Sequence, residues 1–169
     1  MRDWSSDVCS SDLIASIQVV DRNGIVRTIK SEKINFFYRD SDLSDDLIFL
    51  SGTFKGEKQD SKKIKEKMEK LSTLKKKSQP SRIKTCGSTF KNPISQTQKK
   101  TWELIKEAQC ENMKIGGASI SEKHNNFFFN EGSATSNDME NLINLVREKV
   151  FNTTGIKLEL ELQIIGEKK

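Results

Sequence analysis

The sequence is poor in the residues that build metal centres and disulfide frameworks. Its 169 residues include three cysteines, one histidine, one tyrosine and two prolines. Cys9, Cys86 and Cys110 are odd in number and widely spaced, and they form neither a C-x-x-C pair nor a cluster with His124. We therefore expect free thiols in a reducing compartment, and no metal site.

Long apolar runs are also missing. No stretch approaches the roughly 20 apolar residues that span a bilayer, and the N-terminus lacks the basic-then-apolar pattern of a secretory signal. We expect no membrane partner and a cytoplasmic location. With 34% hydrophobic and 31% charged residues, the composition is typical of a soluble chain with a modest core. The length fits one domain or two small ones.

The formal net charge of +5 favours an anionic partner such as a nucleotide, a phosphate or nucleic acid. Most of the excess lysine lies in residues 62–77, which also carry apolar residues at helical spacing and an N-cap candidate in Asp60 or Ser61. The apolar residues are Ile64, Met68, Leu71 and Leu74. Glu66 and Glu69 interrupt the positive charge, and no aromatic residue is interleaved with it. We interpret the lysines as the solvated face of an amphipathic helix and expect no nucleic-acid partner.

Residues 1–13 differ from the rest of the chain. Ser5-Ser6-Asp7-Val8 is echoed by Ser10-Ser11-Asp12-Leu13, with neither strand nor helix periodicity. The stretch is similar to translated sequencing-adaptor sequence. We interpret it as an assembly artefact fused to a truncated reading frame, expect it to be disordered, and exclude it from reasoning about the fold.

From Ile14 onward the periodicity becomes regular. Apolar residues flank Asp21-Arg22-Asn23-Gly24, and the Asn-Gly pair is expected to supply the positive φ angles of a tight hairpin turn. These apolar residues are Ile17, Val19, Ile25, Val26 and Ile29. A further strand is predicted over residues 47–54. Gln79-Pro80-Ser81 should end the lysine-rich helix and mark a domain boundary.

The C-terminal part predicts two helices and two strands. A short helix is expected around Trp102, Ile105 and Ala108, and a strand around residues 126–130. A longer helix is expected to begin with a capping box of Asn137 and Glu140 and to end at Gly155; its core face is predicted to comprise Met139, Leu142, Ile143, Val146 and Val150. Alternating leucines predict a last strand over residues 158–164. Strands and helices do not alternate regularly, so the fold class is α+β.

Two clusters offer groups for anionic ligands. In Phe37-Tyr38-Arg39-Asp40-Ser41, the arginine can hold a carboxylate or phosphate, or else pair at the surface with Asp40 or Asp42. In residues 85–93, Gly87 precedes Ser88, and Lys91 and Asn92 offer donors for a phosphate or sugar. The spacing of this second cluster is neither that of a P-loop nor that of a nucleophile elbow, and it fits a polar loop equally well.

Two further clusters contain titratable residues. Ser121 and His124 suggest a hydrolase pair without a convincing third member, and a structural His124 that orients a loop is favoured. Glu161 lies on the polar face of the predicted last strand, where a solvent-facing carboxylate like Glu159 is the ordinary interpretation.

Taken together and in this order, the clusters resemble the UDP-N-acetylenolpyruvoylglucosamine reductase family. The resemblance runs from about Ile14 to the C-terminus, and its six pieces in the right order make a specific signal. The pieces are Tyr38-Arg39-x-Ser41, Gly87-Ser88-x-Phe90-Lys91-Asn92-Pro93, Gly116-Gly117-Ala118, Ser121-x-Lys123-His124-x-Asn126-Phe127, Ala134-Thr135-x-x-Asp138 and Leu160-Glu161-Leu162-x-Ile164-Ile165-Gly166.

The resemblance implies an enzyme of peptidoglycan synthesis that reduces UDP-N-acetylglucosamine enolpyruvate to UDP-N-acetylmuramate with FAD and NADPH. In such an enzyme the flavin, reduced by NADPH, passes hydride to the methylene carbon of the enolpyruvyl ether. The resemblance further implies that Ser88 is the general acid, and that Arg39 and Glu161 bind and polarise the enolpyruvyl carboxylate. The substrate-binding residues that it implies are Tyr38, Lys91, Asn92, His124 and Asn126.

The resemblance also implies a domain organisation. Residues 14–78 are expected to be the C-terminal remnant of an FAD-binding α+β domain, and residues 79–169 a small α+β substrate-binding domain. The family's glycine-rich flavin-binding loops are missing, so we expect the chain not to hold FAD tightly. The alternative function is that of a non-catalytic UDP-sugar-binding fragment without flavin.

Overall fold

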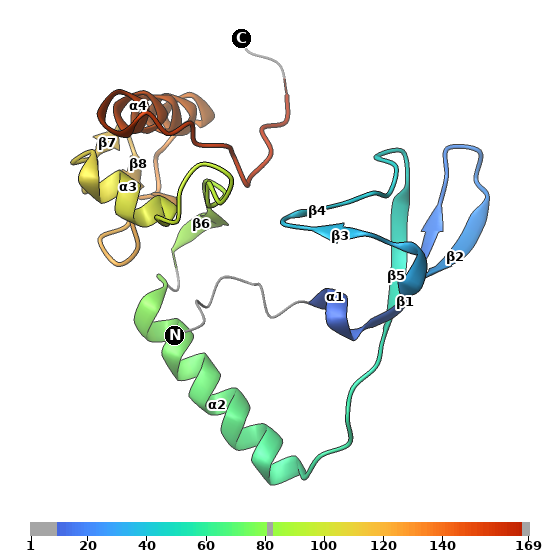
Figure 1. The fold of residues 1–169 in the computed structure, drawn as a ribbon. Coiled ribbons are helices and arrows are strands. Elements are labelled where there is room, and N and C mark those ends of the chain that lie inside the picture. Colours follow the sequence, from blue (N-terminus) through green and yellow to red (C-terminus); the bar gives the residue numbers. More distant parts are fainter. Residues whose placement is uncertain (1–9, 81–82, 167–169) are drawn as a thin grey trace. The chain divides into compact units, whose positions relative to one another are not determined.

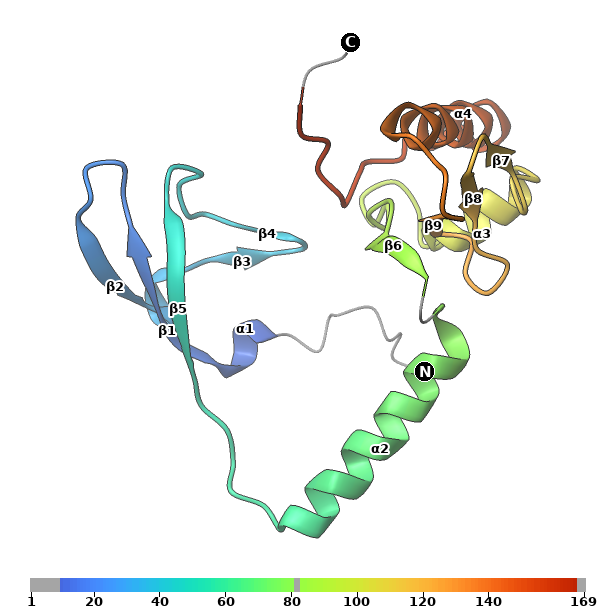
Figure 2. The same cartoon turned by 180° about the vertical axis from the view of Figure 1, so that it is seen from behind.

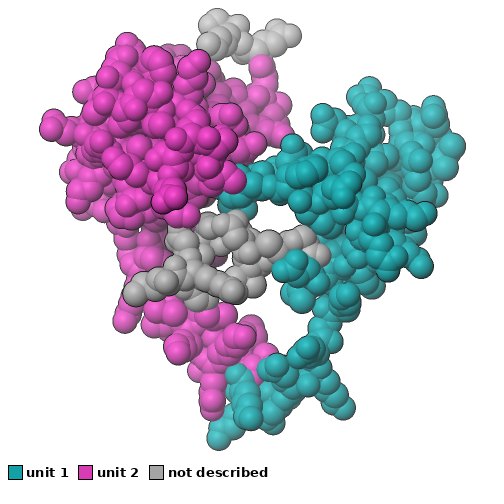
Figure 3. Space-filling model, viewed as in Figure 1, with its two compact units in different colours: residues 1–63 teal, residues 64–169 magenta. Residues whose placement is uncertain are grey.

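A computed structural model describes residues 10–80 and 83–166 of the chain. The chain divides into two compact units, residues 1–63 and residues 64–169, which Figure 3 distinguishes by colour. Both helices and sheets are present, so the predicted α+β class is confirmed. The interpretation of residues 1–9 lies outside the described residues, while α1 (Ser10–Leu13) is a single helical turn. The domain boundary expected after residue 78 stays a prediction.

The first unit contains a three-stranded antiparallel sheet in the order β2–β1–β5, seen from two sides in Figures 1 and 2. Its strands are β1 (Ile14–Val20), β2 (Val26–Lys30) and β5 (Ile48–Phe54), as the apolar pattern predicted. A small core forms where Ile17, Val19 and Ile34 are buried together. After the short 3-10 turn η1 (Ser31–Lys33), a two-stranded hairpin pairs β3 (Phe36–Phe37) with β4 (Asp40–Ser41).

The β1–β2 hairpin is confirmed, but its turn differs from the expected one. Gly24 alone takes a positive φ, of 79°, whereas Asn23 does not. The carboxylate of Asp21 accepts hydrogen bonds from the backbone N–H groups of Asn23 (2.9 Å) and Ile25 (3.1 Å). Because Asp21 satisfies these donors locally, the chain forms a wider loop in which only one residue must be left-handed.

Helix α2 (Ser61–Ser78) forms where the lysine-rich pattern predicted it. The Asp60 carboxylate accepts hydrogen bonds from the N–H groups of Lys62 and Lys63, both at 3.1 Å, so Asp60 is the N-cap. The helix ends at Ser78, directly before Gln79-Pro80. None of its residues is buried, and Met68 is 64% exposed. In the described part of the chain, no helix combines the length and the apolar character that a membrane span requires.

The second unit contains a four-stranded antiparallel sheet in the order β6–β9–β8–β7. Its strands are β6 (Lys84–Ser88), β7 (Lys114–Ile115), β8 (Ala118–Ile120) and β9 (Phe127–Asn130). Helices α3 (Thr101–Glu107) and α4 (Ser136–Thr154) complete the unit. The largest side chains that are fully buried in its core are those of Phe90, Leu104, Ile105, Leu142, Ile143, Val146 and Val150.

The start of α4 corrects the expected capping box of Asn137 and Glu140. The hydroxyl of Thr135 accepts from the Asp138 N–H (3.1 Å), and the Asp138 carboxylate accepts from the Thr135 N–H (2.8 Å). Asn137 cannot be the cap because it lies inside the helix, which already begins at Ser136. The hydrogen bonds from Thr135, its backbone N–H first, lower the pKa of the Asp138 carboxyl group.

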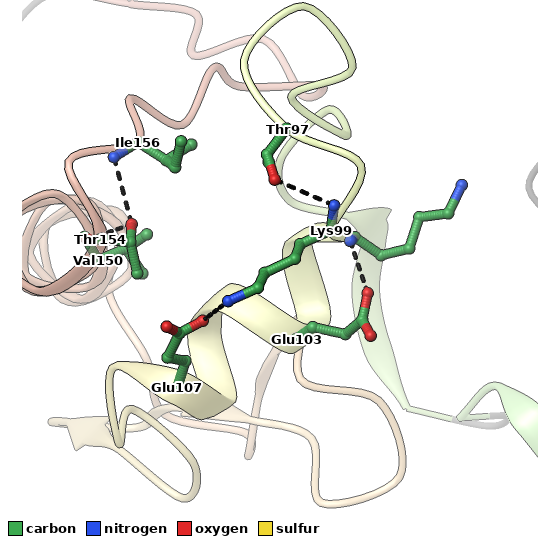
Figure 4. Close-up of polar contacts among 8 residues, drawn as sticks. Thr97, Lys99, Glu103, Glu107, Val150, Thr154 and Ile156 are labelled. Atoms are coloured by element: carbon green, nitrogen blue, oxygen red, sulfur yellow. Dashed lines mark hydrogen bonds and ion pairs between the residues drawn. The ribbon is translucent and has the colours of Figure 1, made fainter.

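Two helix ends of the second unit, those of α3 and α4, have local hydrogen bonds that Figure 4 shows. At α3, the Glu103 carboxylate accepts from the Lys100 N–H (2.7 Å), and Lys99 forms an ion pair with Glu107 (2.7 Å). At the end of α4, the Thr154 hydroxyl donates to the Val150 carbonyl and accepts from the Ile156 N–H. Gly155, with φ of 72°, ends this helix as predicted.

The strand predicted over residues 158–164 is wrong. Only Leu160 forms a bridge, with Phe90, flanked by hydrogen bonds from the Lys91 N–H to the Glu159 carbonyl and from the Glu161 N–H to the Thr89 carbonyl, both 2.9 Å. The ladder goes no further toward Ile164 because residues 162–164 would face residues 86–88 in this register, where Gly87 takes a φ of 91° and strand β6 is irregular. An alternating pattern indicates which side chains share a face, but not over how many residues a neighbouring strand pairs with them.

Gly116 and Gly117, in the turn between β7 and β8, allow this turn to approach the start of α4. A Cβ atom on Gly117 would lie 2.5 Å from the backbone nitrogen of Ala134. One on Gly116, whose φ is +53°, would lie 2.6 Å from the carboxyl carbon of Asp138. The Gly-Gly pair and the Thr135 cap are therefore one packing unit.

We predict that Gly117→Ala destabilises the protein by on the order of 1–3 kcal/mol, because backbone atoms must move to admit the methyl group. Gly56→Ala is the control, since a Cβ atom there meets nothing within 4 Å; its effect should stay within about 0.5 kcal/mol. Urea unfolding followed by circular dichroism compares the two. Equal stabilities of both variants would contradict the packing argument.

Candidate functional site

Ser88 lies at an irregularity in strand β6. The hydroxyl of Thr85 donates to the Phe128 carbonyl (2.7 Å) and accepts from the Gly87 N–H (3.2 Å), while Gly87 takes a φ of 91°. The register against β9 therefore shifts between Thr85 and Ser88. Ser88 is half-buried, and no described residue forms a hydrogen bond with its hydroxyl. This hydroxyl can therefore donate to a ligand.

The segment after Ser88 is held on one side by Asn126. The side chain of Asn126 accepts from the Phe90 N–H (3.0 Å) and donates to the Phe90 carbonyl (2.8 Å), and the Asn126 carbonyl accepts from the Thr89 N–H (2.8 Å). Asn126 is only 4% exposed. The Asn126 carboxamide thus pairs with the N–H and the carbonyl of Phe90, as the backbone of a neighbouring strand would.

A second anchor joins the same segment to helix α3. The buried Thr101 hydroxyl donates to the Lys91 carbonyl (2.8 Å), and the Thr101 N–H donates to the side-chain oxygen of Asn92 (3.1 Å). Asn92 therefore satisfies one of the first N–H groups of α3, which have no partner within the helix. Thr101 was not among the predicted site residues. Its partners Lys91 and Asn92 lie in the loop before α3, and no local sequence pattern links them to Thr101.

Glu161 and Lys91 lie on two neighbouring segments that the Phe90–Leu160 bridge brings together. The Glu161 N–H bonds to the carbonyl of Thr89, which follows Ser88. Glu161 is half-buried, whereas Glu159 is exposed. Glu161 is therefore not a solvent-facing residue like Glu159, which was the ordinary interpretation of its position. Lys91 is half-buried as well, and no carboxylate among the described residues forms an ion pair with it.

His124 belongs to the loop that precedes β9. Its Nδ1 accepts a hydrogen bond from the Asn126 N–H (3.2 Å), and its ring stacks edge-on against Phe127, with centroids 4.8 Å apart. The Ser121 hydroxyl accepts from the Lys123 N–H (3.3 Å), and the Ser121 carbonyl accepts from the His124 N–H (3.2 Å). These bonds agree with a histidine that orients its loop.

Tyr38 and Arg39 form the tip of the β3–β4 hairpin in the first unit. Arg39 is exposed and takes a left-handed φ of 59°, which costs a non-glycine residue on the order of 1 kcal/mol. Its guanidinium carbon lies 5.6 Å from the centroid of the Tyr38 ring. The carboxylate of Asp42 accepts two hydrogen bonds from Asn35, at 3.0 and 2.6 Å. The remaining predicted site residues belong to the second unit.

The other titratable groups of the second unit have structural environments. Lys114 and Ser119 both donate hydrogen bonds to the Glu131 carboxylate and lower its pKa, Lys114 with the larger effect.

Cys86 and Cys110 are free thiols as predicted, and burial raises the pKa of Cys110. Cys9 lies outside the described residues. Across residues 10–80 and 83–166, no three His, Cys, Asp or Glu side chains gather in a way that would hold a metal ion.

Comparisons with known proteins place these features in a family context. The family model for the C-terminal domain of UDP-N-acetylenolpyruvoylglucosamine reductase matches residues 79–165. The reductase of Pelagibacter ubique is 48% identical over 154 residues, which are 91% of this chain and 51% of that protein. The reductase of Rickettsia typhi is 44% identical over 156 residues, covering 92% and 52% respectively.

A solved structure is similar as well. The crystal structure of the UDP-N-acetylenolpyruvylglucosamine reductase from Thermus caldophilus matches with a TM-score of 0.76 and 29% sequence identity. The match covers 90% of this chain and 53% of that one. The chain therefore spans about half the length of the relatives that it matches.

We predict that Thr101→Val destabilises the second unit by about 1–3 kcal/mol, because the change keeps the shape but leaves the Lys91 carbonyl without its donor. Thr153→Val is the control, since Thr153 is exposed near the end of α4; it should change stability by less than about 0.5 kcal/mol. Thermal unfolding of both variants measures the difference. If Thr101→Val is as stable as its control, Thr101 is not an anchor of the site.

Proposed function

The chain belongs to the UDP-N-acetylenolpyruvoylglucosamine reductase family, and on that premise we propose that it forms part of a cytoplasmic enzyme of peptidoglycan synthesis. The proposed reaction reduces UDP-N-acetylglucosamine enolpyruvate to UDP-N-acetylmuramate, with NADPH as reductant and FAD as cofactor. The observation that carries the proposal is the half-buried Ser88 on a segment fixed by Asn126 and bonded to Glu161.

The described residues do not form a cradle for FAD. In the first unit, Gly24 lies in a hairpin loop, Gly52 lies within β5, and the N-terminus of α2 is capped by Asp60. Among residues 10–80, no glycine-rich loop leads into an open helix N-terminus, which is where dinucleotide phosphates bind. We therefore assign no step to FAD in this chain and propose that the other half of the reductases holds it.

Ser88 is the proposed general acid. Reduction of the enolpyruvyl group leaves negative charge on the carbon beside the carboxylate, and this carbon must take up a proton. A serine hydroxyl is a weak acid in water, but a carbanionic centre is basic enough to accept its proton when the hydroxyl is held in place. The proton then passes from the Ser88 oxygen to that carbon.

Arg39 and Glu161 are the proposed partners of the substrate carboxylate. A guanidinium can bind a carboxylate through two parallel hydrogen bonds and offset the charge that develops beside it. A glutamate close to the same carboxylate favours a proton held between the two groups, because two carboxylates at one site do not both ionise readily. Tyr38 belongs to the proposed substrate-binding set through the resemblance, and its ring lies beside the Arg39 guanidinium.

Lys91 and Asn92 are the proposed contacts of the UDP-sugar. Lys91 is half-buried and its ammonium group suits a diphosphate, while Asn92 already holds the start of α3 through its oxygen. The resemblance also implies His124 and Asn126 as substrate-binding residues, but their contacts described above are with the backbone of the second unit.

The alternative is a non-catalytic module that binds a UDP-sugar without flavin. The missing FAD cradle among the described residues favours it for this chain in isolation. Both functions require a ligand at the segment from Ser88 to Asn92, but only the enzyme requires the Ser88 proton.

The test of the enzyme uses a chimera in which residues 14–166 replace the matching half of the Pelagibacter ubique reductase. Ser88→Ala should leave reduction of the flavin by NADPH nearly unchanged, because that half-reaction needs no proton at the substrate carbon. Oxidation by the enolpyruvyl substrate should slow by a factor on the order of 10²–10⁴. Ser95→Ala, at an exposed loop position, is the control.

Stopped-flow measurement separates the two half-reactions of the chimera. Substrate binding should weaken only by the equivalent of about 1 kcal/mol, the net worth of one hydrogen bond. Equal slowing of both half-reactions, or no slowing of either, would exclude Ser88 as the acid.

A further inference from the structure

We propose that His124 and Asn126 act by positioning rather than by touching the substrate. In this proposal, Nδ1 of His124 fixes Asn126, and the carboxamide of Asn126 fixes the backbone of Phe90, so that Ser88 and Lys91 are held ready for the ligand. The identity of the ligand rests on the proposed function, whereas the relay itself rests on the contacts of the second unit.

The first step is the bond between Asn126 and Phe90. These residues are 36 positions apart, and Asn126 meets both the N–H and the carbonyl of Phe90 while its own carbonyl meets the N–H of Thr89. Three hydrogen bonds thus join one buried residue to two consecutive residues of the site. A buried backbone group that loses its partner is costly, so these three bonds hold the segment firmly. One N–H and one lone pair of the carboxamide remain, but Asn126 is only 4% exposed, which leaves little room for a ligand to reach it.

The second step is the bond that His124 accepts. The N–H of Asn126 donates to Nδ1, and a ring nitrogen can accept only when it carries no proton. The ring is held against Phe127 at the start of β9, and the His124 carbonyl accepts from the Phe127 N–H at 2.9 Å. His124 is thereby fixed to the sheet, and it fixes the backbone of Asn126 in turn.

The third step leads from Phe90 to the reacting groups. Phe90 lies between Ser88 and Lys91, and its ring is buried against Phe128, with centroids 5.7 Å apart. Each residue has only two soft backbone dihedrals, so fixing Phe90 restricts where the next side chains lie. A misplacement of about 1 Å at a reacting group can cost roughly 10²-fold in rate, so the three bonds of Asn126 matter for function as well as stability.

Two substitutions of His124 separate positioning from direct contact. His124→Asn places an amide near Nδ1 and can keep an acceptor for the Asn126 N–H, whereas His124→Gln places its amide near Nε2 and cannot. Positioning predicts that His124→Asn resembles the wild type and that His124→Gln does not. A ligand contact through Nε2 predicts the reverse order. Asn125→Ala is the control, because Asn125 is the neighbour in the same loop.

The experiment measures backbone amide hydrogen exchange by NMR in the whole chain. Exchange of the Thr89 and Phe90 amides should accelerate about tenfold in His124→Gln and stay near the wild-type rate in His124→Asn and Asn125→Ala. The amide of Val146, buried in α4, is the internal reference. Equal acceleration at Val146, or unfolding of His124→Gln, would overturn the proposal by showing that His124 stabilises the whole unit.

Affinity for UDP-N-acetylglucosamine, measured on the same variants, supplies the functional readout. It should fall about tenfold in His124→Gln and remain near the wild-type value in His124→Asn. Loss of affinity in His124→Asn alone would overturn positioning in favour of direct contact. If the exchange rates follow the proposal but no variant binds the nucleotide sugar, the relay stands and the proposed function fails.

Discussion

The candidate site depends on how the backbone of residues 89–91 is satisfied. This short segment lies beyond the end of β6 and has no full strand beside it. Asn126 bonds to it on one side, Glu159 and Glu161 bond to it on the other, and Thr101 closes its end. Because buried backbone groups must find partners, these contacts fix the segment without a regular sheet. Ser88 and Lys91 thus belong to a segment whose backbone is held from both sides, as a ligand-binding segment requires.

The pieces of the family resemblance divide into two physical classes. Gly116-Gly117 and the Thr135–Asp138 pair are explained by packing, since the glycines admit the turn against the capped start of α4. Asn92 and Asn126 are likewise engaged by the backbone. Ser88 and Lys91 have no such explanation, and they carry the proposed chemistry. A motif can thus include residues that build a site as well as residues that act in it.

Local patterns predicted most of the fold. The periodicity of α2 and α4, the α2 cap at Asp60 (one of the two predicted candidates), the Gly155 stop and the β1–β2 hairpin all follow from residues that contact their near neighbours in sequence. The predictions failed where the partner was distant or several starts were equally plausible. Alternating leucines suggested a strand at residues 158–164, but residues 162–164 would face the irregular part of β6 at Gly87. Likewise, no local pattern could show that Asn126 holds Phe90, or that Thr101 holds Lys91.

The central claim is that the fixed segment after Ser88 binds the nucleotide sugar. Its most direct test is a titration of the ¹⁵N-labelled chain with UDP-N-acetylglucosamine, followed through the backbone amide signals. The account predicts saturable shifts at Ser88, Lys91 and Glu161, with the lysine-rich helix α2 and the strands β1 and β2 unaffected. Shifts confined to the lysines of α2, or signals at Ser88, Lys91 and Glu161 that do not respond, would contradict it.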